Sequence, residues 1–305
     1  MRFQRGLIAE ANLHSLYLMF NARDGFEREI RQHLACFQAL INQFAEDYSE
    51  AELSAFVAVG AGYWDQLYPD ARPAELCDFP KMSKDNRKAP HTPYDLFIHI
   101  RSDRTDVNHL VGSHVVELFG DAVHLQEQVK GFRYLDGRDL TGFVDGTENP
   151  HGAHRRKVAL VDEAQDATFA GGSYVHIQRY RHAMEQWNEL PTKVQENIIG
   201  RTKADNIEYS KEKKMAFSHV KRTGLKDENG NSIEILRQSM PYGTMKIQGL
   251  FFISVCHSPK PFEIMLRSMI EGDERGQHDK LLEYTKAETG AAFFAPSVDF
   301  LRQFL

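Results

Sequence analysis

A short segment near the middle of the chain combines acidic side chains with residues typical of irregular backbone. It covers residues 142–152 and reads GFVDGTENPHG. Glycine, asparagine and proline favour turns through positive φ, local side-chain hydrogen bonds and a fixed φ. Phe143 and Val144 do not suit a surface turn, and Asp145 and Glu148 do not suit a core strand. The segment is therefore either a loop that carries chemistry or a link between two halves.

Both interpretations of Asp145 stay open at this point. Aspartate before glycine is common in turns. Asp145 and Glu148 also resemble a capping pair or part of a calcium loop, although the full calcium-loop spacing is absent.

A second candidate is Arg237, at the end of a strand predicted over residues 233–237. Side chains alternate between the two faces of a strand, so Arg237 faces the same way as Ile233 and Ile235. On a buried face the guanidinium needs a partner or a function. The alternative is a partly exposed arginine at a sheet edge.

Other familiar catalytic patterns are missing from the sequence. The chain has 14 histidines, but none shows HExxH or Cys/His zinc spacing. It contains no Walker loop, no GxGxxG and no GxSxG. Spacing alone therefore predicts neither a nucleophile nor a phosphate-binding loop.

Composition predicts a globular protein. The 305 residues are 42% hydrophobic and 26% charged, with a net charge of -6, so a nucleic-acid or anionic-membrane surface is not expected. The first ten residues have charges that interrupt any signal-peptide core, and no stretch approaches the length of a membrane span. The three cysteines are far apart, which argues against a disulfide framework. We expect a cytoplasmic protein with reduced thiols.

The elements that must position these residues occur in two similar series. In the first half the pattern predicts strands over 13–21, 55–59, 94–100 and 123–134, with helices over 26–44 and 103–119. In the second half it predicts strands over 174–180, 233–237 and 247–255, helices over 185–199 and 262–269, and a closing strand near 293–294. Polar excursions occupy 61–92 and 202–231.

The order β-α-β-β-α-β is the ferredoxin-like arrangement. The predicted fold class is α+β, with tandem ferredoxin-like domains that each have helices packed on an antiparallel sheet. The predicted divisions are an N-terminal domain over 1–140, a linking segment over 141–170 and a C-terminal domain over 171–305.

Taken together, these segments resemble the dye-decolorising (DyP-type) peroxidases, and most closely the compact bacterial members without a secretion signal. Segment 142–150 matches the GxxDG motif and its continuation. Further similar segments follow in family order: GGSY at 171–174, QRY at 178–180, FSHVKR at 217–222, LRQSMPYG at 236–243 and FFAPS at 293–297. The resemblance covers nearly the whole chain.

The resemblance implies one haem b in the second domain, with His219 as the iron ligand. Asp145 and Arg237 would lie on the opposite, distal face, with Ser239 beside them where many relatives have asparagine. The implied cofactor-binding residues are Val144, Asp145, Gly146, Thr147, His219, Arg237 and Phe252; Phe251 is the alternative to Phe252. A carboxylate usually supports such a histidine; Asp279 is expected, with Glu283 as the rival. Possible propionate ligands are Arg155, Arg156 and His176, and possible electron relays are Trp187, Tyr180 and Tyr242.

The implied function is a peroxidase that reduces hydrogen peroxide and oxidises dyes, phenolics or porphyrinogens by single-electron steps through a ferryl intermediate. The alternative is a haem-handling protein for haem or porphyrin binding, delivery or iron release, with incidental peroxidase activity. A third hypothesis is a structural or cargo protein. The expected partners are peroxide and a small-molecule electron donor, and neither nucleic acid nor membrane is expected. Because members of the family often form oligomers, the resemblance also implies a homo-oligomer, either a dimer or larger.

Overall fold

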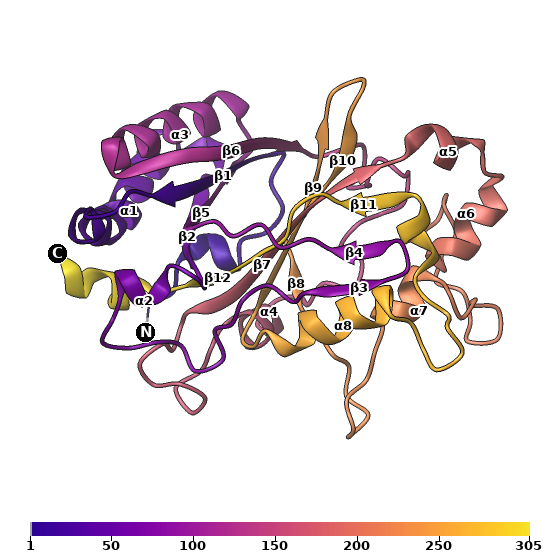
Figure 1. The fold of residues 1–305 in the computed structure, drawn as a ribbon. Coiled ribbons are helices and arrows are strands. Elements are labelled where there is room, and N and C mark those ends of the chain that lie inside the picture. Colours follow the sequence, from indigo (N-terminus) through magenta and orange to yellow (C-terminus); the bar gives the residue numbers. More distant parts are fainter. Residues whose placement is uncertain (1) are drawn as a thin grey trace.

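The computed structural model describes residues 2–305 and contains one large antiparallel sheet with helices at its two ends (Figure 1). The strand order is β11-β7-β12-β2-β5-β1-β6-β9-β10-β8, and β7 also pairs with β10. The strands are β1 (His14–Ala22), β2 (Ser54–Gly60), β5 (Leu96–Ser102), β6 (Val123–Phe132), β7 (Ser173–His182), β8 (Leu236–Arg237), β9 (Met240–Gly243), β10 (Gln248–Cys256), β11 (Thr285–Ala287) and β12 (Ala291–Ala295). A separate hairpin, β3 (Met82–Lys84) and β4 (Arg87–Ala89), lies within the excursion 61–92.

Helices connect the strands of both halves. The α-helices are α1 (Glu27–Asp47), α2 (Trp64–Leu67), α3 (Thr105–Phe119), α4 (His154–Ala159), α5 (Met184–Glu189), α6 (Thr192–Ile199), α7 (His219–Thr223), α8 (Lys260–Ile270) and α9 (Val298–Leu301). The 3₁₀ helices are η1 (Arg5–Leu7), η2 (Ser49–Ala51), η3 (Gly120–Ala122), η4 (Lys280–Glu283) and η5 (Arg302–Phe304). None of the helices formed by residues 2–305 is both long and apolar enough to cross a membrane.

Both halves have ferredoxin-like strand order, which confirms the predicted fold class. In the first half the order is β2-β5-β1-β6, so the first strand lies between the third and the fourth. In the second half β7 takes the same place between β10 and β12, with β8 and β9 beyond β10. The halves meet at two strand pairs: Phe294 of β12 with Val59 of β2, and Gly131 of β6 with Tyr242 of β9.

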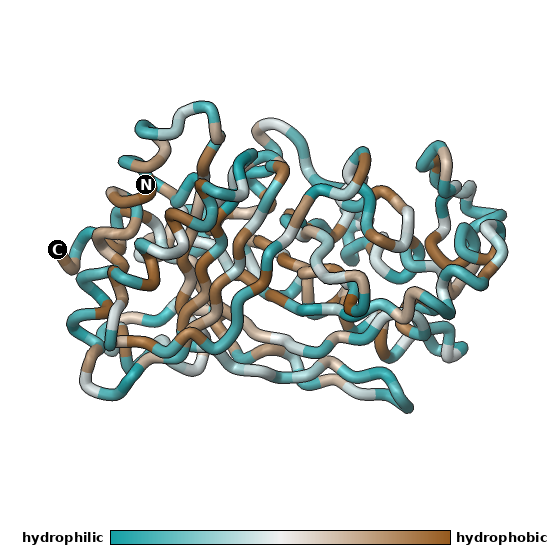
Figure 2. Tube along the Cα trace, turned by 90° about the horizontal axis from the view of Figure 1, so that it is seen from above, coloured by the Kyte–Doolittle hydropathy of each residue, from teal (hydrophilic) through white to brown (hydrophobic). Residues whose placement is uncertain are grey.

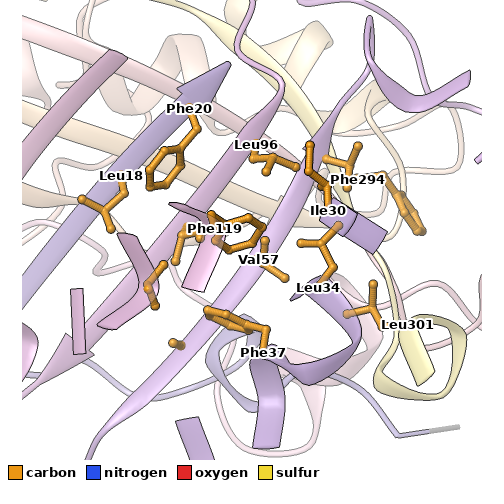
Figure 3. Packing of buried hydrophobic residues seen from close by; sticks show 14 of the residues in the cluster. Leu18, Phe20, Ile30, Leu34, Phe37, Val57, Leu96, Phe119, Phe294 and Leu301 are labelled. Atoms are coloured by element: carbon orange, nitrogen blue, oxygen red, sulfur yellow. The ribbon is translucent and has the colours of Figure 1, made fainter. Parts of the chain in front are cut away.

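Alternate side chains of the first-half strands enter two different cores. One face packs under α1 and α3, where Phe20, Phe37 and Phe119 meet (Figure 3). The other face carries Tyr17 and Phe97, which pack against residues of β7 and β10. Strands buried on both faces are apolar along their whole length, which explains why 13–21 alternates poorly. Hydrophobic residues gather along these strands, whereas most outer loops are hydrophilic (Figure 2).

Two predicted elements of the second half were wrong in extent. The helix expected over 185–199 is divided into α5 and α6, because Pro191 has no N–H to donate and forces Leu190 into an extended conformation, ψ 134°. The strand expected over 233–237 pairs only at Leu236–Arg237. The backbone N–H of Ile233 bonds instead to the carbonyl of Leu225 at 3.0 Å, and the side chains of 233–235 line two adjoining cavities.

Candidate active site

A histidine and a buried carboxylate form the base of the candidate site. His219 is the first residue of α7, and its Nδ1 lies 2.6 Å from Oδ2 of Asp279. The other carboxylate oxygen of Asp279 accepts a hydrogen bond of 3.0 Å from the backbone N–H of Leu281. Asp279 has no exposed surface, so its position beside the ring is fixed. The pairing leaves Nε2 of His219 as the nitrogen that can bind a metal.

This geometry distinguishes the two expected supporting acids. Asp279 contacts His219, whereas Glu283 is half exposed and lies 3.7 Å from His278. Asp279 can take this position because it lies just before η4, and its backbone N–H bonds the carbonyl of Met269 at the end of α8.

One cavity extends from His219 to Asp145 and Arg237. It encloses about 940 Å³, part of it continuous with solvent. Its wall is largely apolar. The apolar side chains come from α6, β10, α8, η4 and the stretch before β8: Ile199, Leu250, Phe252, Phe262, Met265, Leu266, Met269, Leu281 and Ile235. Phe252 lines this cavity, while Phe251 points to the opposite face and stacks on Tyr17 with ring centroids 4.1 Å apart.

Asp145 is held by a loop between β6 and α4 that depends on its glycines. Gly142 and Gly146 have φ of 89° and 73°, a region that residues with a Cβ rarely adopt. A Cβ on Gly146 would also lie 3.0 Å from Nδ2 of Asn149. The backbone N–H of Asp145 donates to the carbonyl of Gly137 at 3.1 Å, which fixes the carboxylate over the cavity.

Arg237 reaches the same cavity from β8, and Asn149 ties it to the loop. Nδ2 of Asn149 donates to the carbonyl of Arg237 at 2.9 Å, and the Arg237 N–H donates to Oδ1 of Asn149 at 2.8 Å. No sequence motif pointed to Asn149. Asparagine followed by proline is typical of a turn. Nothing in the sequence indicated that Asn149 bonds Arg237, 88 residues away.

The carboxylate of Asp145 and the guanidinium of Arg237 each shift the pKa of the other. Burial raises the pKa of Asp145, and the charge of Asp139 raises it further, while Arg237 and the Gly146 N–H oppose this shift. Burial lowers the pKa of Arg237, and the charge of Asp145 opposes that. An arginine keeps its positive charge throughout.

Asp139 and His182, which sequence reasoning missed, form a polar pair at the inner end of the cavity. Nε2 of His182 lies 3.0 Å from Oδ1 of Asp139, and its Nδ1 lies 2.9 Å from Oγ1 of Thr285. Burial opposes ionisation of Asp139, but His182 and the hydroxyl of Thr141 hold its pKa below the ordinary value.

The other predicted site residues lie in two adjoining cavities. Gly146 and Thr147 line the mouth beside His219, together with Arg201, which pairs with Glu148 and with Glu208 at 2.9 Å. Ser239 lines a second cavity that shares Asp145 and Arg237 with the first. Its Oγ accepts a hydrogen bond of 3.2 Å from the Ile253 N–H.

None of the three suggested propionate ligands lines the cavity or its mouth. Arg155 lines only the second cavity, Arg156 lies over the ring of Phe3, and His176 is buried in a stack with Phe262. Strand and helix patterns did not reveal this, because the direction of each side chain depends on how the halves pack.

The suggested relay residues are also separated. Tyr180 lines the cavity and donates its hydroxyl to Oε1 of Gln178 at 2.9 Å. Trp187 is fully buried behind the wall residue Phe143, 6.1 Å between ring centroids. Tyr242 is buried near Arg179, away from this cavity's lining.

Comparison with known proteins matches both halves. Residues 4–133 match the N-terminal and residues 136–300 the C-terminal model of Dyp-type peroxidase. A dye-decolorizing peroxidase of Mycolicibacterium paratuberculosis is 38% identical over 97% of this chain and 84% of its own length. A dyp-type peroxidase protein of Shewanella oneidensis superimposes with a TM-score of 0.98 at 56% identity, covering 100% of this chain and 99% of that one. A Rhodococcus jostii DypB variant in complex with haem gives 0.94 at 36% identity, covering 98% and 97%.

These matches cover nearly the whole chain in both sequence and fold. The chain therefore belongs to the Dyp-type peroxidase family. It is an oxidoreductase that acts as a peroxidase, as the resemblance of its motifs predicted.

Proposed function

We propose that this peroxidase uses one haem b per chain to reduce hydrogen peroxide, and that it oxidises dyes, phenolics or porphyrinogens in single-electron steps. The observation that carries the proposal is one apolar cavity with a carboxylate-supported imidazole at one side and Asp145 with Arg237 at another. A DypB of similar fold binds haem. The apolar wall of the cavity and the free Nε2 of His219 suit an iron porphyrin.

His219 would hold the iron, and Asp279 would strengthen it as a donor by accepting a hydrogen bond from Nδ1–H. Val144 and Phe252 would pack against the macrocycle, with Gly146 and Thr147 at its edge towards the mouth. Arg201 at the mouth is a better candidate for a propionate than the three residues first suggested. The haem supplies the iron that exchanges electrons with peroxide and donor.

The distal residues manage protons and charge. Asp145, when ionised, takes a proton from one peroxide oxygen and returns it to the other as the bond between them breaks. Arg237 is a fixed cation in the same cavity, so it stabilises the negative charge that develops on the leaving oxygen. Ser239 lies beside both in the second cavity, where its hydroxyl proton can orient a water or the peroxide.

The decisive test is Arg237→Ala with haem still loaded. Absorption spectra before and after one equivalent of peroxide should show a Soret shift in the parent protein and a reaction about 10²–10³-fold slower in the variant. Lost peroxide reactivity together with fast haem transfer to an acceptor protein would favour haem handling as the physiological role. A parent protein that binds haem but shows no spectral reaction with peroxide would overturn the proposal.

The remaining expectations belong to the same proposal. They are a cytoplasmic location, a homo-oligomeric assembly and the division at residues 1–140, 141–170 and 171–305. Size-exclusion chromatography with light scattering tests the assembly, and limited proteolysis tests the division.

A further inference from the structure

A second cavity lies on the other side of the Asp145 loop, and we call it the vestibule. It is lined by Glu10, Asn12, Arg101, Arg133, Arg155 and Ser239, among others. It encloses about 1050 Å³, part of it continuous with solvent. Because it shares Val144, Asp145 and Arg237 with the candidate haem cavity, any molecule bound in it would lie next to the distal residues.

The vestibule is cationic, although the chain as a whole has a net charge of -6. Five arginines line it, against three carboxylates: the arginines are 101, 133, 138, 155 and 237, and the acids are Glu10, Asp136 and Asp145. Asp145 and Arg237 belong to the proposed peroxide chemistry. The other two acids are each engaged by one arginine, Glu10 by Arg155 at 3.2 Å and Asp136 by Arg138 at 2.7 Å.

Two arginines are left over. Within residues 2–305, neither Arg101 nor Arg133 forms an ion pair with a carboxylate. Arg133 is exposed. Its charge contributes to lowering the pKa of Asp136, but that carboxylate is already paired with Arg138. Arg101 is only 3% exposed, which is unusual for a guanidinium without a paired acid.

The hydrogen bonds of Arg101 are incomplete. Its Nε donates to Oδ1 of Asn12 at 3.1 Å, and its Nη2 donates to the carbonyl of Glu10. Its Nη1 is buried and has no partner among the described residues. Burial lowers the pKa of Arg101 to about 10 and the charge of Arg155 adds to the lowering, while Tyr17 and the charges of Glu10 and Asp103 oppose it. A buried cation with a missing acceptor favours an anion as ligand.

We infer that the vestibule binds a small aromatic carboxylate, with the carboxylate between Arg101 and Arg133. The aromatic ring would pack on the less polar part of the lining, which includes Tyr134, Met240 and Pro241. If the aromatic carboxylate is also a phenol, it would lie beside Asp145 and would serve as an electron donor. That role rests on the proposed function: two phenols each lose one electron and one proton, and one peroxide gains both pairs and forms two waters.

Binding can be measured apart from catalysis. We would titrate the haem-loaded protein with 4-hydroxybenzoate and with its methyl ester by calorimetry. The acid should bind at least ten-fold more tightly than the ester, because only the acid makes charge-assisted hydrogen bonds, and added salt should weaken only the acid. Arg133→Gln should weaken the acid about ten-fold and leave the ester unchanged; this side chain is exposed, so the variant should fold. Arg28→Gln, an exposed arginine on α1, is the matched control.

The outcomes separate this inference from the proposed function. Equal affinities for acid and ester, or an Arg133→Gln variant that binds the acid as tightly as Arg28→Gln does, would overturn the inference even if peroxidase activity is intact. If the acid binds as expected, kcat/KM for 4-hydroxybenzoate should fall in Arg133→Gln relative to that for the ester. Tight binding of the acid without oxidation of either phenol would uphold the site and refute its role with a donor.

Discussion

The side chain of Asn149 brackets the backbone of Arg237, with one hydrogen bond of 2.9 Å to its carbonyl and one of 2.8 Å from its N–H. The two residues are separated by 88 positions in the sequence. Asn149 lies in the loop that carries Asp145, and Arg237 lies in β8. The contact therefore ties the backbone of Arg237 to the loop that carries Asp145. An asparagine that is typical of a turn in sequence therefore joins the two segments that carry Asp145 and Arg237.

Asn149→Ala should impair both the peroxide reaction and the stability of the protein. Two hydrogen bonds to partly buried backbone would be lost, at a cost of about 1–3 kcal/mol in free energy of unfolding. Misplacing Arg237 should slow the reaction with peroxide by about 10²-fold. Urea denaturation and stopped-flow absorption measure the two effects. Asn188→Ala, at an exposed position on α5, is the control; an unchanged peroxide rate in Asn149→Ala would mean that the joint does not position Arg237.

Asp279→Asn should weaken the hold of His219 on iron. The amide removes the negative charge next to Nδ1, so we expect a loss of about 10–100-fold in haem affinity or peroxide reactivity. Haem transfer to an apo-acceptor and the absorption spectrum of the ferric protein report on the ligand bond. Glu283→Gln provides the comparison, because that carboxylate is half exposed and faces His278 instead. Equal effects of the two variants would refute the assignment of Asp279.

Asp139→Asn should shift the acid limb of the pH profile. The pKa of Asp145 is raised by burial and by the charge of Asp139, so Asp145 loses its proton only at a higher pH than an ordinary aspartate. Because the base works when ionised, the peroxide rate should fall as the pH drops through this raised pKa. Removing the charge at 139 lowers the pKa of Asp145, and the rate should then persist to lower pH.

The measurement is the rate constant for the reaction with peroxide, followed by stopped flow from neutral to acidic pH. Asp136→Asn is the matched control: Asp136 is exposed, pairs with Arg138 and does not line the haem cavity. A shift of the acid limb in the opposite direction would show that Asp139 acts on Asp145 by some means other than charge. A rate that rises steadily from neutral into alkaline pH would count against Asp145 as the proton carrier.

Trp187→Phe separates relay from packing. Trp187 is fully buried, and its Nε1 donates to the carbonyl of Thr141 at 2.9 Å. We expect a loss of about 1–3 kcal/mol in free energy of unfolding, from the hydrogen bond and from the space left in the core. If Trp187 also carries electrons, kcat for a large dye should fall while the peroxide reaction is unchanged. Unchanged dye turnover would leave Trp187 a structural residue.

The sequence alone determined the order of most helices and strands and the family of the protein. The periodicity of hydrophobic residues and the positions of turn residues predicted two β-α-β-β-α-β series. This was possible because hydrophobic periodicity is a local property of the sequence. Ile235 and Arg237 do line the same cavity, as predicted, although Ile235 lies outside the strand on which that prediction depended. The order of the motifs along the chain also indicated the family.

Only the tertiary structure decided which distant groups meet. The halves join at β2–β12 and β6–β9, and this joining turns Phe252 into the cavity and Phe251 away from it. It also brings Asp279 rather than Glu283 to His219, and it leaves Arg101 buried in the vestibule without a carboxylate. Such contacts depend on how sheets and helices pack across long separations in the chain. No residue's own neighbours in sequence encode them.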